Sequence, residues 1–381
     1  MQKSKTLVFV VTEDWYFYSH RRPMVRAAQE EGFSVCVITN IDRHRDAIEK
    51  LGVKVIPFSF ERRNLNPLKA LCQIQKIKKI YQQEKPDIAH HIAMKPVLLG
   101  SIAAWLAGVP RVINAFAGLG FVFNARNFLA HVIRAGLWLP FFVLLRHKNT
   151  YLLFQNRDDL ATLEKQGFVV AARARIIRGS GIDLDLYPVM LFEPSDPDFI
   201  CTFAGRMIGI KGLPTLKEAF VLLEKQYPQI RLHLYGRPDP ENPGSWREEE
   251  LRQWEAQSNN VAYKGHAENM AQIWGHSHVA IQASYGGEGV PKSLLEAAAC
   301  GRAIIATNVP GCREVVEEGN NGFLVPPYDA RALADAIIKL ASDTALCRAM
   351  GEKSRAMVEG DMSADSVRKQ TAALYRLCME G

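Results

Sequence analysis

Two series of short apolar runs, each alternating with longer segments of helical period, are the strongest constraint on how this chain folds. The runs of the first half are rich in β-branched and aromatic residues, as strands are. Alternation of such strands with helices predicts right-handed β–α–β units and a parallel sheet. The predicted strands lie at residues 6–11, 34–38, 53–58, 87–92, 112–116 and 151–155, and the helices between them include 23–31 and 67–84.

The alternation restarts after residues 186–198, a segment with three prolines and no periodicity, where we place the interdomain linker. The second series of predicted strands lies at 199–204, 231–235, 279–283, 303–306 and 323–325. A chain of 381 residues also suits two domains better than one. The sequence therefore predicts an α/β protein with two doubly wound parallel-sheet domains facing across a cleft, with ligands at the carboxyl ends of the strands.

Charge is distributed unevenly between the two halves. Residues 1–190 hold 27 Lys and Arg against 15 Asp and Glu, a net charge of +12, whereas the remainder has a net charge of −5. A basic half predicts an anionic partner: nucleic acid, an anionic membrane or a phosphate-bearing acceptor. No helix-turn-helix, RNA-binding signature or zinc finger is present, so no nucleic-acid partner is expected. A merely solvated basic surface is the alternative.

The cysteines and the apolar runs predict where the protein resides. Seven scattered cysteines without a CxxC pair indicate reduced thiols, and the apolar run at 6–11 is too short for a signal peptide. The longest apolar stretch, 128–145, has basic ends but is interrupted by His131, Arg134 and Pro140. It is a poor spanning helix and suits an in-plane membrane anchor or an acceptor-docking helix. A buried helix pair broken at Pro140 is the alternative. We expect a cytoplasmic protein, peripheral on the inner face of the cell membrane.

A loop and helix in the second half carry two glutamates, Glu288 and Glu296, with seven residues between them. Pro291 suits the first helical position, and Gly301 suits the position just past the helix end. The leading amides of such a helix are unpaired donors at the positive end of its dipole and can cradle a diphosphate. Carboxylates on either side can accept hydrogen bonds from sugar hydroxyls. A surface helix with two solvated glutamates is the alternative.

Two cations follow the predicted strand 199–204, in the segments Gly205-Arg206 and Lys211-Gly212. A glycine-bearing turn with a guanidinium and an ammonium suits a leaving diphosphate. A donor aimed at charge that develops on a leaving oxygen is typically worth about 3–4 kcal/mol of barrier. A solvated loop with two cations is the alternative.

The order of these motifs closely resembles the group 1, or family 4, retaining glycosyltransferases of the GT-B fold. The resemblance covers nearly the whole chain and is most specific in the second half. It is closest to the branch that builds O-antigen, capsule and other glycans on polyprenyl diphosphate. The segments that carry it are 205–212, 265–266, 288–296, 310–314 and 321–322, preceded by 114–123, 154–156 and 179–185.

The resemblance implies transfer of a sugar from a UDP-sugar to a lipid-diphosphate-linked glycan with retention of configuration. Residues 1–187 would bind the acceptor and 188–362 the nucleotide-sugar donor, while a C-terminal helix in 363–381 would pack back on the first domain. Arg206 and Lys211 would hold the diphosphate, Glu288 the hydroxyls of the donor sugar, and Glu296 the ribose. Further donor-binding residues would be Gly205, Gly236, Arg237, His266, Gly289, Val290 and Pro291.

One departure from the family pattern concerns the acceptor side. Several branches have a histidine where this chain has Ala117, just before Gly118 and Gly120. His20, His90 and His91 are the candidate replacements, with a structural histidine as the alternative for each. Lys95, Gly118 and Gly120 are the other acceptor-side candidates.

We predict that no metal or other cofactor is required. The Asp-x-Asp pairs Asp183/Asp185 and Asp196/Asp198 lie at a domain edge and in the linker, and the cations Arg206 and Lys211 would replace a metal electrostatically. Two other functions remain open: a nucleotide-sugar 2-epimerase of the same fold and a non-catalytic nucleotide-sugar-binding partner subunit. A nicotinamide-dependent dehydrogenase is disfavoured because no GxGxxG follows the first strand.

Overall fold

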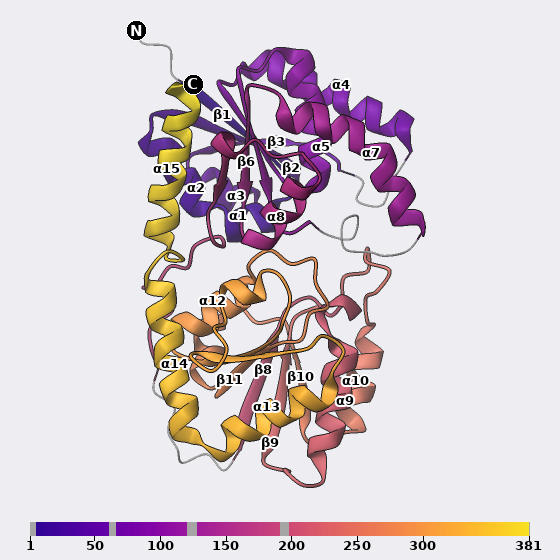
Figure 1. Ribbon diagram of the computed structural model, residues 1–381, viewed down its shortest axis with the longest axis vertical. Coiled ribbons are helices and arrows are strands. Elements are labelled where there is room, and N and C mark those ends of the chain that lie inside the picture. Colours follow the sequence, from indigo (N-terminus) through magenta and orange to yellow (C-terminus); the bar gives the residue numbers. More distant parts are fainter. Residues whose placement is uncertain (1–4, 61–65, 120–127, 191–197, 381) are drawn as a thin grey trace. The chain divides into compact units, whose positions relative to one another are not determined.

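The computed structural model describes residues 5–60, 66–119, 128–190 and 198–380. The chain divides into two compact units, each with its own parallel sheet (Figure 1). Unit 1 comprises Met1–Gly181 with Ala364–Gly381, and unit 2 comprises Ile182–Ser363. The predicted α/β class with two doubly wound domains is confirmed.

Unit 1 is built on a seven-stranded sheet in the order β3-β2-β1-β4-β5-β6-β7, with every described pair parallel. The order reverses between β1 and β4, which makes the carboxyl ends of these strands the expected place for a ligand. The strands are β1 (Lys5–Glu13), β2 (Phe33–Asn40), β3 (Val53–Pro57), β4 (Ile88–Ile92), β5 (Arg111–Phe116), β6 (Thr150–Phe154) and β7 (Ala174–Ile176).

Helices cover both faces of this sheet, so its central strands β1 and β4 are buried along most of their length. One face packs on α2 and α15, and the other packs on α4 and α5. The helices of unit 1 are α1 (Asp14–His20), α2 (Arg22–Glu30), α3 (Arg45–Glu49), α4 (Pro67–Glu84), α5 (Met94–Ala107), α7 (Phe128–Arg146), α8 (Arg157–Lys165) and α15 (Ala364–Glu380). Helix α7 continues through Pro140, so the alternative of a helix pair broken there is wrong.

Unit 2 repeats the plan with a six-stranded parallel sheet in the order β10-β9-β8-β11-β12-β13. Its order reverses between β8 and β11. The strands are β8 (Phe199–Ala204), β9 (Ile230–Tyr235), β10 (Val261–Gly265), β11 (Val279–Gln282), β12 (Ala303–Thr307) and β13 (Gly322–Val325). The helices are α9 (Leu213–Glu224), α10 (Glu248–Ala256), α11 (Met270–Gly275), α12 (Lys292–Ala299), α13 (Ala330–Ser342) and α14 (Thr344–Glu359).

The chain passes from unit 1 to unit 2 between Gly181 and Ile182, before the predicted linker at 186–198. Ile182 is buried in the core of unit 2, and its N–H donates to the Met362 carbonyl at 2.9 Å. It also forms a β-bridge with Ser363, the last residue before the chain returns to unit 1. The predicted linker is where the periodic pattern of the sequence stops, and this position differs from the point where the chain crosses between the units. Residues 191–197 of the predicted linker lie outside the described residues.

All seven cysteines of the sequence lie in the described part of the chain, and all are free thiols. Six are buried, and Cys72 on α4 is exposed. Burial raises the pKa of Cys36 and Cys300 to about 11. The buried thiols therefore behave as small apolar side chains.

Candidate active site

Backbone contacts bring the loops of unit 2 together at the carboxyl edge of its sheet. Gly236, just after β9, has φ of +145°, and a Cβ there would lie 1.7 Å from the Gly205 carbonyl oxygen. Gly212 has φ of +84°, and a Cβ there would lie 2.0 Å from the Ala283 carbonyl oxygen. Only glycine fits at either position. The loops that follow β8, β9 and β11 therefore meet at one place, where the sheet order reverses.

The two predicted diphosphate cations both lie at this edge and both contact carboxylates. Lys211 ends a short 3₁₀ turn, and its ammonium lies 2.6 Å from Glu288, with side chains only 15% and 17% exposed. The Arg206 guanidinium contacts Asp239 at 2.7 Å and is 45% exposed. The Tyr285 N–H donates to the Ile210 carbonyl at 2.9 Å, which fixes the Lys211 turn against the loop that carries Glu288. The structure thus joins two motifs that are far apart in sequence.

The sequence analysis missed Asp239, which lies in the loop between β9 and α10. Backbone hydrogen bonds hold this loop on the Arg206 loop: Met207 N–H donates to Arg237 at 3.0 Å, and Gly209 N–H donates to Gly244 at 2.7 Å. Asp239 is mostly buried, so its carboxylate positions the Arg206 side chain. The only sequence signal was a single acid between two prolines.

Helix α12 begins at Lys292 with Pro291 as its N-cap, one position later than predicted. Pro291 takes an extended conformation, with φ of −66° and ψ of 121°, so the helix starts only after it. Gly289 and Val290 precede the cap and are buried, and Gly301 follows the C-cap Cys300 with φ of +74°. The amides of the first turn of α12 therefore face the edge of the sheet where Glu288 lies.

Glu296 occupies the second turn of α12 and is only 8% exposed. The Tyr187 hydroxyl donates to its Oε1 at 2.9 Å, and the Lys292 ammonium lies 3.6 Å from the same oxygen. Burial raises the pKa of Glu296, and nearby Lys292 and the Tyr187 hydrogen bond oppose that rise. A buried carboxylate held in this way can accept hydrogen bonds from ligand hydroxyls.

Arg237 and His266 follow β9 and β10 and are both exposed. The Gly236 N–H donates to the Gly265 carbonyl at 2.8 Å, which ties the ends of these neighbouring strands together. Both predicted donor-binding residues therefore lie at the carboxyl edge, beside the loop that carries Arg206.

The acceptor-side candidates lie in unit 1, and the structure separates them into two groups. His91 is fully buried, with Nε2 2.8 Å from the Tyr81 hydroxyl and Nδ1 2.8 Å from Asn114 Oδ1. Burial lowers the pKa of His91 to about 4, so its ring is neutral near pH 7. His90 is also fully buried, 3.1 Å from the Tyr375 hydroxyl, and burial lowers its pKa well below the usual value. Both rings lie inside the unit, as the alternative of a structural histidine expects, and the acceptor-side role of His90 and His91 stays a prediction.

The remaining candidates lie at the carboxyl edge of the unit 1 sheet. His20 ends α1, directly after β1, with its Nδ1 2.6 Å from Ser19 Oγ and its ring stacked 4.3 Å from Tyr16. Lys95 follows β4, and Gly118 follows β5 with φ of +93°. Because β1, β4 and β5 are neighbours, these three residues share one edge of the sheet. Gly120 lies outside the described residues.

Two further features concern the binding of metals and membranes by the described residues. No group of three or more His, Cys, Asp or Glu side chains gathers there as metal ligands do. Asp183 accepts a hydrogen bond from the Asp185 N–H at 3.3 Å, and Asp196 lies outside these residues. In the same part of the chain, no helix combines the length and apolarity that crossing a bilayer requires.

Two family models match the chain. The glycosyl transferases group 1 model matches residues 198–343, and the glycosyl transferase 4-like model matches residues 6–152. The chain belongs to these glycosyltransferase families. The predicted family is thereby confirmed, and each unit carries one of the two matches.

Relatives and solved structures agree with this assignment. An N,N'-diacetylbacillosaminyl-diphospho-undecaprenol alpha-1,3-N-acetylgalactosaminyltransferase of Campylobacter jejuni is 25% identical, over 86% of this chain and 87% of its own length. A UDP-Gal:alpha-D-GlcNAc-diphosphoundecaprenol alpha-1,3-galactosyltransferase of Escherichia coli is 23% identical, over 74% of both chains. Anabaena HepE, solved with UDP and glucose, superposes with a TM-score of 0.76 at 18% identity, over 97% of this chain and 99% of that one. The predicted GT-B fold is confirmed.

Proposed function

We propose that this glycosyltransferase moves a sugar from a UDP-sugar to a lipid-diphosphate-linked glycan, with retention of configuration, in cell-surface polysaccharide assembly. The observation that carries the proposal is the contact of Lys211 with Glu288 beside the start of α12. It gathers an ammonium, a carboxylate and helix amides at one edge, as a sugar diphosphate requires. The two relatives named for undecaprenol-diphosphate-linked acceptors support the acceptor class.

In the proposed reaction the bond between the sugar C1 and the diphosphate oxygen breaks, and its electron pair leaves with the UDP. Arg206 and Lys211 neutralise the charge that develops on the diphosphate. The acceptor hydroxyl bonds to C1 on the face that the diphosphate leaves, and its proton passes to the departing phosphate. Glu288 is the catalytic carboxylate that orients hydroxyls of the donor sugar, and Glu296 binds the ribose. No protein nucleophile is needed.

We propose further that catalysis needs no metal, because two cationic side chains already serve the leaving group. Wild-type turnover should be unchanged in excess EDTA. Loss of turnover that Mn²⁺ or Mg²⁺ restores would contradict this part of the proposal.

The proposed donor and mechanism are tested by UDP release from a panel of UDP- and GDP-sugars, with and without an undecaprenyl-diphosphate-linked glycan. We expect a UDP-sugar to release UDP only when the acceptor is present. The NMR spectrum of the product should show the same anomeric configuration as the donor. Release of free sugar or an epimer without acceptor would indicate a 2-epimerase. Absence of turnover with intact binding of UDP-sugar would indicate a non-catalytic subunit.

We also propose that unit 1 binds an anionic membrane on its cytoplasmic side, since its acceptor would be lipid-linked and the first half of the chain is strongly basic. Co-sedimentation with vesicles of anionic lipid should decrease as salt rises. Equal binding to neutral and anionic vesicles would exclude the electrostatic component.

A further inference from the structure

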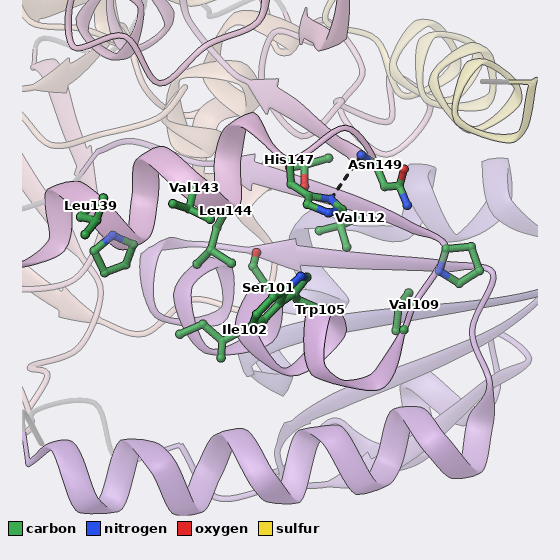
Figure 2. A pocket seen from close by; sticks show the side chains of 14 residues that line it. Ser101, Ile102, Trp105, Val109, Val112, Leu139, Val143, Leu144, His147 and Asn149 are labelled. Carbon is green, nitrogen blue, oxygen red and sulfur yellow. Dashed lines mark hydrogen bonds between the residues drawn. The ribbon is translucent and has the colours of Figure 1, made fainter.

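An apolar cavity of about 470 Å³ lies between α5 and α7 in unit 1. Figure 2 shows Ile102 and Trp105 of α5 on one side, and Leu139, Val143 and Leu144 of α7 on the other. Trp105, Leu139 and Val143 are 64%, 63% and 57% exposed, so the mouth of the cavity is apolar as well as its wall. Exposed apolar surface around an apolar cavity is typical of a site for an apolar ligand.

The charge of the surrounding chain indicates what kind of apolar ligand approaches. Residues 88–157, which include both helices, contain seven Lys and Arg and no Asp or Glu. Two of these cations, Arg146 and Lys148, are exposed directly after the cavity-lining part of α7. An apolar mouth beside exposed cations matches a hydrocarbon chain at an anionic lipid surface.

The cavity lies at the opposite edge of the sheet from the acceptor-side candidates. Its wall includes Val112 and Thr150, at the beginnings of β5 and β6, whereas Gly118 follows the end of β5. With a rise of about 3.3 Å per residue, the six residues of β5 separate the two edges by roughly 17 Å. A ligand whose polar end reacts at the carboxyl edge must therefore carry a long chain to reach the cavity.

We propose that this α5–α7 cavity holds part of the isoprenoid chain of the lipid-linked acceptor. The inference rests on the proposed function and adds a binding site for the chain to it. Long-chain acceptors gain contacts in the cavity, whereas an acceptor with a chain much shorter than about 17 Å gains none.

The test compares Val143→Glu with Trp138→Glu in neutral detergent micelles. Both side chains are exposed apolar residues of α7, but Trp138 does not line the cavity. Loss of the burial of two methylene groups changes binding about tenfold. V143E should therefore raise the KM for an undecaprenyl-linked acceptor by at least about tenfold and leave turnover of a short-chain analogue unchanged. W138E should change neither.

Val143→Gln makes the same position polar without adding a charge. If the loss of apolar contacts with the isoprenoid chain is the cause, this variant should also raise the KM for the undecaprenyl-linked acceptor. If V143E and W138E raised the KM equally, the effect would belong to the whole helix face, and the cavity proposal would be overturned. An unchanged KM in V143E would overturn it too.

Binding of undecaprenyl phosphate, measured without donor, separates this proposal from the proposed function. Loss of that binding in V143E alone would support the cavity even if the wild type transferred sugar to no acceptor. Conversely, the wild type could transfer sugar while V143E bound undecaprenyl phosphate as well as the wild type does. That result would leave the proposed function intact and refute the proposal that the cavity binds the isoprenoid chain.

Discussion

At the scale of single residues, the ion pair between Lys211 and Glu288 joins the two charged groups that the proposed reaction uses most directly. The two groups lie 2.6 Å apart and are mostly shielded from water. An incoming diphosphate can take the ammonium as its partner and leave the carboxylate to accept hydrogen bonds from sugar hydroxyls. Because the contact holds the two opposite charges close together, the proposed reaction would need little reorganisation of these side chains.

Removing either cation should reduce turnover strongly. We expect Arg206→Ala and Lys211→Ala each to lower kcat by about 100-fold or more, because a donor to the developing oxyanion is lost. Lys225→Ala, which removes an exposed cation of the same unit, is the matched control and should retain activity. Near-normal kcat in both site variants would refute the assigned leaving-group site.

Loss of the Lys211 ammonium should also affect stability, and a double-mutant cycle measures this effect. Lys211→Met leaves the Glu288 carboxylate without its cation and should cost about 1–3 kcal/mol of unfolding free energy in unit 2. Adding Glu288→Gln should recover part of that loss, with a coupling energy of about 1 kcal/mol. Strictly additive losses in urea unfolding would show that the pair is not coupled.

The Glu296 carboxylate should lower the stability of the folded protein near pH 7 while strengthening UDP-sugar binding. Burial raises its pKa above the usual 4.5, so between 4.5 and the raised pKa the folded state binds more protons than the unfolded state. The free energy of unfolding therefore falls as pH rises through that window. Glu296→Gln should raise the thermal midpoint at pH 7, with the gain vanishing below pH 4.5, and should weaken UDP-sugar binding measured by calorimetry. A lower midpoint at pH 7 would contradict this account.

Sequence patterns indicated the residues of the site that carry their own motif, such as Lys211 and Glu288. They did not indicate Asp239, because its contact with Arg206 depends on how the β9–α10 loop lies on its neighbour. Nor did they decide between surface and interior for His90 and His91. Alternation along a strand does not show which face a helix covers when both faces are buried.

At the scale of elements, regular strands were predicted well because each is an apolar run bounded by turn residues. Strand β7 was missed because it has three residues, none of them fully buried. Strand β10 was absent from the predicted strands, although its final Gly265 belongs to a segment that carries the family resemblance. The start of α12 was predicted one residue early, because the extended Pro291 caps the helix from outside.

The end of α4 offers a test of helix termination. Lys85 caps this helix in the left-handed conformation, with φ of 47° and ψ of 56°. Lys85→Gly should stabilise unit 1 by about 0.5–1 kcal/mol, since glycine adopts this conformation without a Cβ clash. Lys79→Gly, at an exposed position inside the same helix, should instead destabilise it by about 1 kcal/mol. Chemical denaturation of both variants checks the opposite signs.

At the scale of the whole molecule, the chain returns to unit 1 for its final helix (Figure 1). Helix α15 buries Val367, Leu374 and Tyr375 in the core that also contains α2. Contacts that join the two ends of a chain lie beyond any local pattern. The return was expected only from the family resemblance, not from periodicity.

Truncation after Ser363 should unfold unit 1 and leave unit 2 folded. Each buried apolar side chain of α15 contributes about 1.5–3 kcal/mol, and a domain has only about 5–15 kcal/mol in total. Hydrogen exchange should show lost protection in β1 and β4 but not in β8. The control, Arg376→Ala, removes an exposed ion pair with Glu31 and should change stability by less than about 1 kcal/mol. Retained protection in β1 after truncation would refute this dependence.

The distribution of thiols makes the natural chain ready for spectroscopy. Cys72 on α4 is the one exposed sulfhydryl among seven, so a maleimide fluorophore should attach at a single position without prior removal of the others. A dye there would report from unit 1 while every residue of the donor site stays native.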